Sequence, residues 1–325
     1  MIEWSDTFVT YFGDRLHRDH PLGALTTYKV GGPATWLIEV DSVDDLKVIS
    51  DEVSRAGVEV FVIGRGSNVL VSDAGFEGLA LRLGAGFETI ELPELADRSP
   101  GDEVIVCAGG AVALPVLARR LAAHGIEGFE WGVGIPGSIG GAVKMNAGGH
   151  GSDMAAVLVD AEVFDLDQGQ ISTIGGGDLG LRFRGSALAR SAVVVGVRLR
   201  LSVGEPSRSQ TRVSEIVKWR REHQPGGQNC GSVFVNPEPG RVAAGALIDQ
   251  IGLKGYRYRS AQVSPKHANF IQASESGSAD DVKALMDQVR GQVVDQTGYL
   301  LRSEVRLVGF EGIDPWSFDD PEVAR

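Results

Sequence analysis

Clusters of glycine constrain the fold of this chain more than any other feature of its sequence. The chain has 44 glycines in 325 residues, and many gather in GRGSN (64–68), GFEWGVGIPGSIGGAVKMNAGGHGSD (128–153) and TIGGGDLG (173–180). Glycine allows positive φ and allows the backbone to approach another group closely. Such stretches are either tight loops packed on a sheet or cradles in which backbone N–H groups bind an anion.

The composition restricts the class of protein. Hydrophobic residues make up 43% of the chain and charged residues 23%, which is typical of a globular protein. The net charge of −12 argues against a nucleic-acid or anionic-membrane partner and favours small-molecule ligands. The N-terminus carries acids and no long apolar core, and no apolar run could span a membrane, so we expect a cytoplasmic protein without membrane insertion.

The cysteine content indicates neither a metal site nor a redox pair. Cys107 and Cys230 are far apart in sequence and match no metal-ligand or dithiol spacing, so no metal is expected. Cys107 lies within the apolar stretch EVIVCAG, where it is most simply a small core residue.

Hydrophobic periodicity predicts a mixed α+β chain in two main parts. A strand at 34–40, a helix capped by Ser42 and ended by Gly57, and a strand at 58–64 open the chain. Near residue 205 the composition of the chain becomes more polar, and the sequence predicts a polar helix that ends at Pro225. We expect a first domain over 1–205, a second over 206–310 and a polar tail over 311–325. The first divides into lobes of about 25–90 and 91–205, and further helices are predicted at 113–125, 241–252 and 278–298.

Two stretches match the dinucleotide pattern G-x-G-x-x-G, and neither has the required context. GVGIPG at 132–137 is interrupted by Pro136, and only IEGFEW precedes it where a strand is needed. GGGDLG at 175–180 is not followed by a helix. The sequence therefore does not predict a nicotinamide-binding Rossmann domain.

The long glycine-rich stretch supports a different phosphate site. Pro136 is expected to start a helical turn along which Gly137, Ser138, Gly140 and Gly141 expose backbone N–H groups. This loop and the loop at 64–68 could then hold the two phosphates of one dinucleotide. The alternative is close packing of a helix on a sheet, which also requires small residues.

Seven motifs occur in the order found in the UDP-N-acetylenolpyruvoylglucosamine reductase family: TTYKVGG, GRGSNVLV, WGVGIPGSIGGAVKMNAG, FRGS, GSVFVNP, SPKHANF and SEVRLVG. The chain resembles the shorter type of these UDP-N-acetylmuramate dehydrogenases over about residues 24–310. The resemblance implies a PCMH-type (vanillyl-alcohol-oxidase-like) FAD-binding fold plus a smaller α+β substrate-binding domain. It implies non-covalent FAD, with NADPH as co-substrate. The residues expected to bind the cofactor are Gly64, Arg65, Gly66, Ser67, Asn68, Gly134, Ile135, Pro136, Gly137, Ser138, Gly141, Ala142 and Asn146.

The resemblance also implies a reaction and three catalytic residues. The family reduces the enolpyruvyl vinyl ether of UDP-GlcNAc-enolpyruvate in peptidoglycan precursor synthesis. Arg184 of FRGS matches the family's arginine, which suits a carboxylate that gains charge. Ser232 of GSVFVNP matches the proton donor. Glu304 of SEVRLVG matches a glutamate near the intermediate, and an acid in an apolar strand is costly unless it is paired, which itself indicates a functional position.

The sequence departs from the family at two positions. Phe183 stands where the family usually has tyrosine, and Val235 stands where it often has lysine. The cation lost at Val235 would come from Arg241, Lys254 or Lys266, and we assign Arg241, Lys266 and Asn236 to substrate binding. His267 is expected to be structural, and His150 is expected to lie on a loop beside the flavin.

Two other functions remain open from the residues alone. A flavin oxidase of the same fold would attach FAD covalently through His or Cys, and GRGSN contains neither. A UDP-sugar-binding module without redox activity would not need Arg184, Ser232 and Glu304 together. The oligomeric state does not follow from the sequence.

Overall fold

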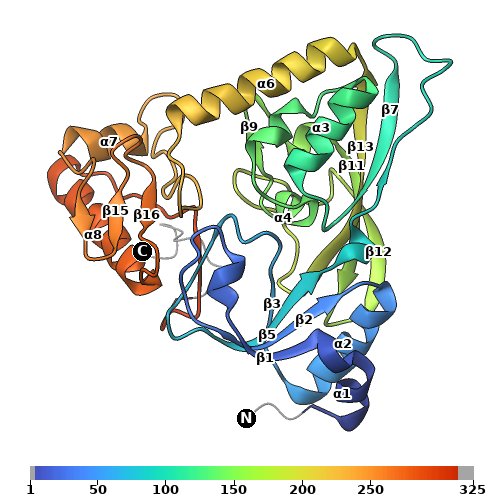
Figure 1. Ribbon diagram of the computed structural model, residues 1–325, viewed down its shortest axis with the longest axis horizontal. Helices are drawn as coiled ribbons and strands as arrows, with labels where there is room; N and C mark the ends of the chain where they lie inside the picture. The colour runs from blue at the N-terminus through green and yellow to red at the C-terminus, as the bar shows by residue number, and fades with distance from the viewer. Residues whose placement is uncertain (1–3, 314–325) are drawn as a thin grey trace. The chain divides into compact units, whose positions relative to one another are not determined.

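The computed structural model describes residues 4–313, which form two compact units (Figure 1). Within the described residues, unit 1 contains 4–17, 36–65 and 78–220, and unit 2 contains 18–35, 66–77 and 221–313. Two N-terminal segments thus group with the C-terminal part. The division at residue 205 stays a prediction about domains, and the predicted tail lies outside the described residues from 314 onward.

The first part of unit 1 is built on a four-stranded sheet in the order β1-β2-β5-β3, in which β3 runs parallel to β5. Aromatic and aliphatic side chains of the two N-terminal helices pack in its core, among them Phe8, Phe12, Leu46 and Ile49. The elements are α1 (Asp6–Phe12), β1 (Leu16–His20), β2 (Ala34–Val40), α2 (Val43–Ala56), β3 (Val60–Val62) and β5 (Phe76–Leu83).

Helix α2 begins and ends where the sequence predicts. The Ser42 side chain accepts a hydrogen bond from the Asp45 N–H at 3.1 Å, and the Asp45 carboxylate accepts one from the Ser42 N–H at 3.2 Å. This reciprocal pair is a capping box. Gly57 ends the helix with φ of +61°, in the left-handed region where glycine is least strained.

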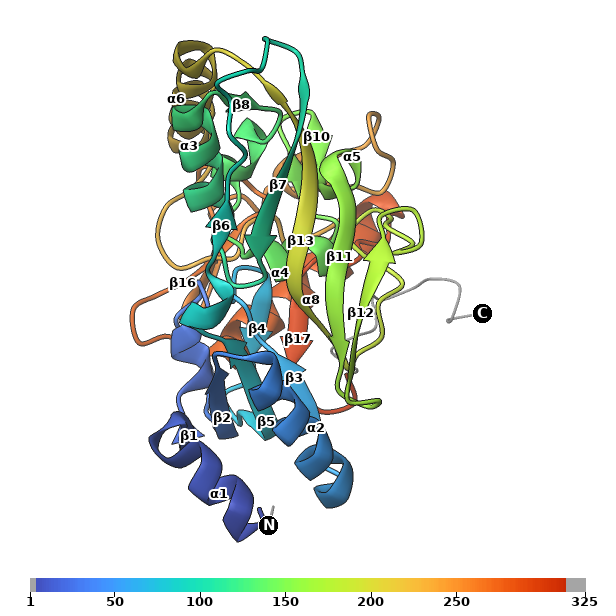
Figure 2. The same cartoon turned by 90° about the vertical axis from the view of Figure 1, so that its right-hand side faces the viewer.

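The second part of unit 1 is a larger antiparallel sheet in the order β12-β11-β13-β7-β6, with β8 also paired to β13. Figure 2 shows β7, β13, β11 and β12 side by side. Along β13, Leu199 and Leu201 are buried in the core while Arg198 and Arg200 are exposed. The elements are β6 (Ile90–Glu91), β7 (Glu103–Gly109), α3 (Leu114–His124), β8 (Ile126–Glu127), α4 (Ile139–Lys144), β9 (Gly148–Gly149), β10 (Ser152–Asp153), α5 (Met154–Val157), β11 (Leu158–Asp165), β12 (Gln170–Gly175) and β13 (Ala192–Val203).

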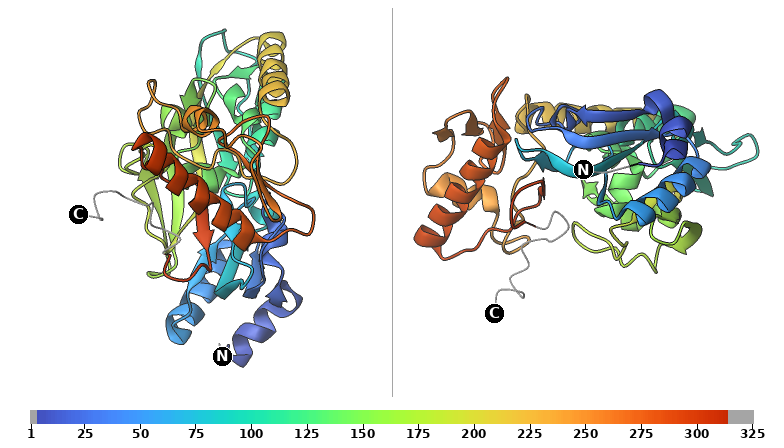
Figure 3. Two further views of the ribbon diagram at one scale, coloured as in Figure 1. Left: turned by 90° about the vertical axis from the view of Figure 1, so that its left-hand side faces the viewer. Right: turned by 90° about the horizontal axis from the view of Figure 1, so that it is seen from below.

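Unit 2 contains a three-stranded sheet, β14-β15-β16, against which the long helix α8 packs (Figure 3). A separate parallel pair joins β17 to β4. Tyr28 and Leu70 from the two N-terminal segments are fully buried in the same core as α7 and α8, which explains why these segments belong to unit 2. The elements are β4 (Val69–Val71), α7 (Ala244–Gln250), β14 (Arg257–Tyr258), β15 (Ala261–Val263), β16 (Ile271–Ala273), α8 (Ala279–Thr297) and β17 (Arg306–Val308); α6 (Pro206–His223) precedes α7.

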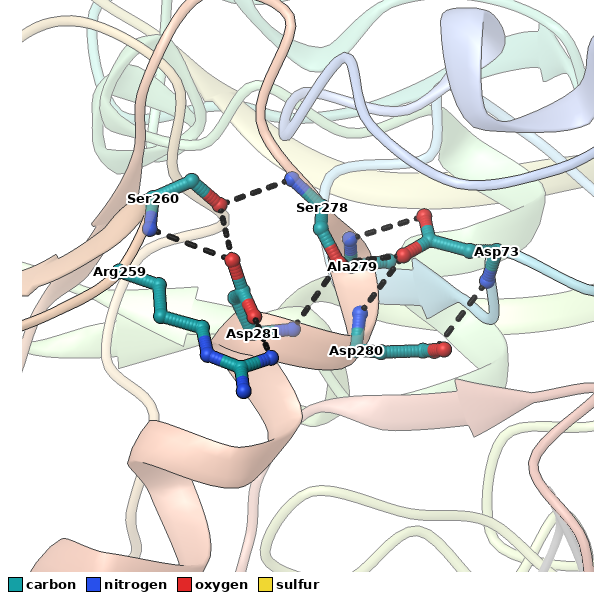
Figure 4. Close-up of polar contacts among 7 residues, drawn as sticks. All are labelled: Asp73, Arg259, Ser260, Ser278, Ala279, Asp280 and Asp281. Atoms are coloured by element: carbon teal, nitrogen blue, oxygen red, sulfur yellow. Dashed lines mark hydrogen bonds and ion pairs between the residues drawn. The ribbon is translucent and has the colours of Figure 1, made fainter.

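Asp73 connects the segment after β4 to the start of α8, 207 residues further along the chain (Figure 4). Its carboxylate accepts hydrogen bonds from the N–H groups of Ala279 at 3.0 Å and Asp280 at 3.2 Å, and from the Ser278 hydroxyl. In return, the Asp280 carboxylate accepts the Asp73 N–H at 3.3 Å. A carboxylate from a distant segment thus satisfies N–H groups that a helix leaves without intrahelical partners.

The same turn of α8 is held from its other side through Asp281. The Ser260 hydroxyl donates to the Asp281 carboxylate at 2.7 Å, the Ser260 N–H donates at 3.2 Å, and Arg259 lies 3.5 Å away (Figure 4). These contacts, the Ser260 hydroxyl first, hold the pKa of Asp281 below its usual range. They therefore stabilise the fold at neutral pH, and this stabilisation is lost as the pH falls through that lowered pKa.

We expect Asp73→Ala to lower the free energy of unfolding by about 2 kcal/mol, the upper range for loss of a helix cap. Asp73→Asn should cost less, because an amide oxygen can still accept one of the N–H groups. Asp287→Ala, which removes an exposed carboxylate of α8 paired with Lys283, is the control and should change stability by less than about 0.5 kcal/mol. Urea unfolding of the three variants measures these differences. Equal effects of Asp73→Ala and Asp287→Ala would contradict the assigned role.

Candidate functional site

The first predicted cofactor loop follows β3 and contains Gly64–Asn68. Gly64 and Arg65 are exposed, whereas Gly66 is buried and has φ of +58°. A Cβ at Gly66 would lie 2.6 Å from the Leu25 carbonyl oxygen and 2.6 Å from the Thr26 Cα. Position 66 therefore requires glycine for two reasons: its φ is positive, and the TTYKVGG segment lies too close to leave room for a side chain.

The second predicted cofactor loop meets the first within unit 1. A five-residue 3₁₀ helix, Glu130–Gly134, leads through residues 135–137 to Ser138, which is buried at the start of α4. A Cβ at Gly64 would lie only 2.5 Å from the Ser138 hydroxyl oxygen. Two glycine-rich loops thus approach each other as closely as a side-chain-free residue permits. This is the arrangement expected of a cradle for a phosphate group.

The expected helical turn at Pro136 is wrong, because α4 begins at Ile139 with Ser138 as its N-cap. The N–H groups of Ile139 and Gly140 donate to the carbonyls of Val112 at 2.9 Å and Gly110 at 2.8 Å. These two N–H groups are therefore not available to a ligand. For Gly140 the alternative interpretation is therefore correct: this small residue allows the helix to pack closely on the sheet.

Ala142 and Asn146, two other predicted cofactor residues, make contacts within the fold itself. Ala142 is buried in the core, and its N–H donates to the Ser138 carbonyl at 2.8 Å. Asn146 has φ of +40°, and its side-chain oxygen accepts the Ala155 N–H at 2.9 Å. Gly134, Ile135 and Gly137 are half-buried, and Pro136 and Gly141 are exposed.

His150 lies beside the second cofactor loop. Its ring meets the Trp219 ring edge-on at 5.0 Å, and a Cβ at Gly134 would lie 3.2 Å from it. Burial, assisted by the charges of Arg212 and Arg220, lowers the pKa of His150, so the imidazole is neutral at pH 7. Its predicted place next to the flavin stays a prediction.

Arg184 occupies a strained position in a tight turn of unit 1. Arg182 and Gly185 exchange backbone hydrogen bonds of 2.9 and 3.0 Å, and Arg184 between them has φ of +57°. Positive φ is uncommon for a residue with a side chain, and Arg184 shares it with six other non-glycine residues of the described chain. The guanidinium carbon lies 5.4 Å from the centre of the Phe183 ring, which is 63% exposed.

Ser232 and Glu304 lie on neighbouring paired segments of unit 2. The Glu304 N–H donates to the Val233 carbonyl at 2.8 Å, and the Val235 N–H donates to the Arg302 carbonyl at 2.9 Å. Ser232, half-buried, directly precedes this pairing, and Glu304 is 7% exposed. The structure therefore brings two of the three predicted catalytic residues into one local arrangement.

A buried thiol lies near Glu304. Cys230, two residues before Ser232, is buried, and burial raises the pKa of its thiol to about 12, with the Glu304 charge acting in the same direction. The fully buried Tyr28 lies next to this thiol, and burial raises the pKa of its phenol well above the usual range. Both groups are therefore neutral at physiological pH.

The predicted substrate residues have local partners. Asn236 is exposed, and its side-chain oxygen accepts the Ala244 N–H at 3.0 Å. Arg241 lies 3.4 Å from the Glu238 carboxylate, and Lys254 lies 3.2 Å from that of Asp249. Lys266, also exposed, donates to the Arg221 carbonyl oxygen at 2.5 Å.

One residue of this region was missed by sequence reasoning. The side chain of Asn269, 4% exposed, accepts the Phe234 N–H at 3.0 Å and donates to the Phe234 carbonyl at 2.8 Å. It lies in SPKHANF, the motif that also contains His267. His267 packs on Phe270 and accepts the Asn269 N–H at 3.2 Å, which fits a structural role. A buried asparagine in an apolar stretch was the available signal, since such an amide must be hydrogen-bonded.

Two further features concern residues 4–313 only. In this part of the chain, no group of three or more His, Cys, Asp or Glu side chains could hold a metal ion. No helix within the same range has the length and apolar character needed to cross a membrane.

Family models of known proteins match two parts of this chain. Residues 34–175 match the family model of an FAD binding domain, and residues 223–308 match that of the C-terminal domain of UDP-N-acetylenolpyruvoylglucosamine reductase. The UDP-N-acetylenolpyruvoylglucosamine reductase of Prochlorococcus marinus is 38% identical over 298 residues, covering 91% of this chain and 99% of the relative. That of Gloeobacter violaceus is 40% identical over 299 residues, covering 91% and 97%.

A solved structure shows similarity to the same family of reductases. The crystal structure of UDP-N-acetylenolpyruvylglucosamine reductase from Thermus caldophilus is 33% identical, with a TM-score of 0.76, and covers 90% of this chain and 99% of that one. The expected fold class, the FAD cofactor and the classification as an oxidoreductase are thereby confirmed. The chain belongs to the UDP-N-acetylenolpyruvoylglucosamine reductase family.

Proposed function

We propose that this chain reduces UDP-GlcNAc-enolpyruvate to UDP-N-acetylmuramate, with NADPH as the reductant, in peptidoglycan precursor synthesis in the cytoplasm. The observation that carries the proposal is the pairing of Glu304 with Val233, which keeps the segments of Ser232 and Glu304 adjacent. A hydroxyl and a buried carboxylate held this way suit a proton transfer next to developing charge.

Each catalytic residue has a separate task in this reaction. Bound FAD supplies the hydride that the enolpyruvyl methylene receives. Arg184 stabilises the negative charge that then grows on the substrate carboxylate, because its guanidinium stays cationic and can bind a carboxylate through two hydrogen bonds. Ser232 delivers a proton to the neighbouring carbon, and Glu304 sets the local charge that this step experiences.

The residues assigned to the cofactor are those of the two loops that meet at Gly64 and Ser138. We assign the pyrophosphate of FAD, held without a covalent bond, to the loops 64–68 and 134–146. The close approach of Gly64 to the Ser138 hydroxyl supports this, because it brings the two loops together. Gly140 and the side chain of Ala142 are excluded from direct contact, because both are used within the fold.

Lys266 is the favoured replacement for the cation that is lost at Val235. Arg241 and Lys254 each face a carboxylate. Within the described part of the chain, Lys266 pairs with no carboxylate and binds a backbone carbonyl instead. Its charge is therefore the least compensated of the three, and we assign it, with Asn236 and Arg241, to the phosphates and sugar of the substrate.

The purified protein provides the test. It should be yellow, lose this colour with NADPH in the absence of oxygen, and regain it when UDP-GlcNAc-enolpyruvate is added. Mass spectrometry should then show a product that carries two more hydrogens than the substrate. A colourless protein that binds UDP-sugars would instead be a binding module. Flavin that stays with acid-precipitated protein would indicate a covalent flavin oxidase.

The two substrates should use one site in turn, because the sequence shows no separate nicotinamide domain. Initial rates measured at several concentrations of both substrates should therefore give the parallel double-reciprocal lines of a ping-pong mechanism. Isolation of a ternary complex that contains NADPH and the UDP-sugar together would contradict this.

A further inference from the structure

One row of hydrogen bonds connects four segments of unit 2. The Asn68 side-chain N–H donates to the Glu304 carbonyl, the Glu304 N–H donates to the Val233 carbonyl, and the Val233 N–H donates to the Asn269 carbonyl. All three distances are 2.8 Å. We call this the amide row; it contains Asn68, Glu304, Val233 and Asn269. It runs from the cofactor loop through both catalytic segments.

Asn68 binds the Glu304 segment at two points. Besides the bond from its side chain, its own carbonyl accepts the Arg306 N–H at 3.0 Å. The parallel pairing of β4 with β17 begins at the next residue, where Val69 lies opposite Arg306. The Asn68 amide therefore extends this pairing beyond the end of β17 to the backbone of Glu304.

The opposite end of the row is fixed in a similar way. The Asn269 side chain binds both the N–H and the carbonyl of Phe234. Asn269 thus holds the segment that follows Ser232, as Asn68 holds the segment of Glu304. Because a buried carboxylate has few conformations open to it, the position of the Glu304 backbone determines where its charge lies.

We propose that Asn68 is a positioning residue for Glu304: its side-chain amide binds the Glu304 backbone, rather than the cofactor, and connects the Gly64–Asn68 loop to the reacting centre. The inference rests on the proposed function, because it takes Glu304 to act in the reoxidative half-reaction. It also gives the side chain of Asn68, a residue that the sequence assigned to cofactor binding, a different task.

The variant Asn68→Ala separates these two roles. Loss of the bond releases the Glu304 backbone, so reoxidation by UDP-GlcNAc-enolpyruvate should slow by about 10-fold to 100-fold, the range for a misplaced catalytic group. Reduction by NADPH and the FAD dissociation constant, measured by flavin fluorescence on the apoprotein, should change less than about 2-fold. Asn68→Asp, which places an oxygen against the Glu304 carbonyl, should slow reoxidation at least as much as Asn68→Ala.

Coupling between the two residues distinguishes positioning from general destabilisation. In the Glu304→Gln background, Asn68→Ala should cause little further loss, because the group it positions has already been changed. The control is Gln288→Ala on α8, which removes a side-chain amide that accepts a hydrogen bond from the Tyr256 hydroxyl and should leave both half-reactions unchanged.

Three outcomes would overturn the inference. Weakened FAD binding with normal reoxidation at saturating FAD would make Asn68 a cofactor contact. Additive effects of Asn68→Ala and Glu304→Gln would show that the residues act independently, and unchanged reoxidation in Asn68→Ala would remove the role altogether. If the wild-type protein itself were not reoxidised by UDP-GlcNAc-enolpyruvate, the proposed function would fail first, and the inference with it.

Discussion

Ser232→Ala should slow reoxidation of the reduced enzyme by UDP-GlcNAc-enolpyruvate at least about 100-fold, the low end for loss of a positioned general acid. The same variant should be reduced by NADPH at a near-normal rate, because proton delivery to the enolpyruvyl carbon plays no part in that step. The backbone around Ser232 is held by Asn269 and by the segment of Glu304, so the substitution should not disturb the fold. Stopped-flow absorbance of the flavin measures each half-reaction separately.

Glu304→Gln should damage the same half-reaction. The change keeps the size of the side chain and removes a negative charge from a site that is only 7% exposed, where charge is weakly screened. Ser54→Ala, an exposed serine of α2, is the matched control for loss of a hydroxyl and should leave both half-reactions unchanged.

The opposite pattern would show that the assignment is wrong. If Ser232→Ala slowed reduction by NADPH and left reoxidation intact, the hydroxyl would contact the nicotinamide or a phosphate. Equal slowing of both steps would indicate a general distortion of the site.

The helices and strands could be predicted because residues next to their ends determine where they begin and end. Helix α2 lies between Ser42 and Gly57, as the capping signals predict, and α8 (Ala279–Thr297) falls within the helix predicted at 278–298. The strand at 34–40 was also predicted with the bounds that the structure shows. These signals depend on contacts between residues close in sequence, so the local sequence is sufficient to predict these elements.

The site could be predicted only in part, because its geometry depends on distant contacts. The motifs identified Ser232 and Glu304 through family resemblance, whereas the bonds that hold them come from Asn68, 236 residues away from Glu304, and from Asn269. No spacing rule links such positions. Likewise, Pro136 follows a local rule for helix starts, but backbone bonds to Val112 and Gly110 place the start of α4 at Ile139 instead.

Gly66→Val should cause the largest loss of folded protein among single changes in the cofactor loops. Valine is strained at φ of +58°, and its Cβ would lie 2.6 Å from two backbone atoms of Leu25 and Thr26. Backbone strain of about 1–3 kcal/mol and overpacking of about 1–3 kcal/mol together predict a loss of about 2–6 kcal/mol in the free energy of unfolding. The purified variant should also lack the yellow colour of bound FAD.

Measurement on the apoprotein separates the two reasons for this glycine. If the contact with Leu25 and Thr26 is decisive, the variant apoprotein should unfold at a much lower urea concentration than the wild-type apoprotein. If access of a phosphate to the loop were the only requirement, the two apoproteins would be equally stable and only FAD binding would be lost. Gly177→Val is the control, because a Cβ at Gly177 meets no atom within 4 Å and its φ is not positive. We expect the first outcome, because the atoms that exclude a side chain at Gly66 belong to the chain itself.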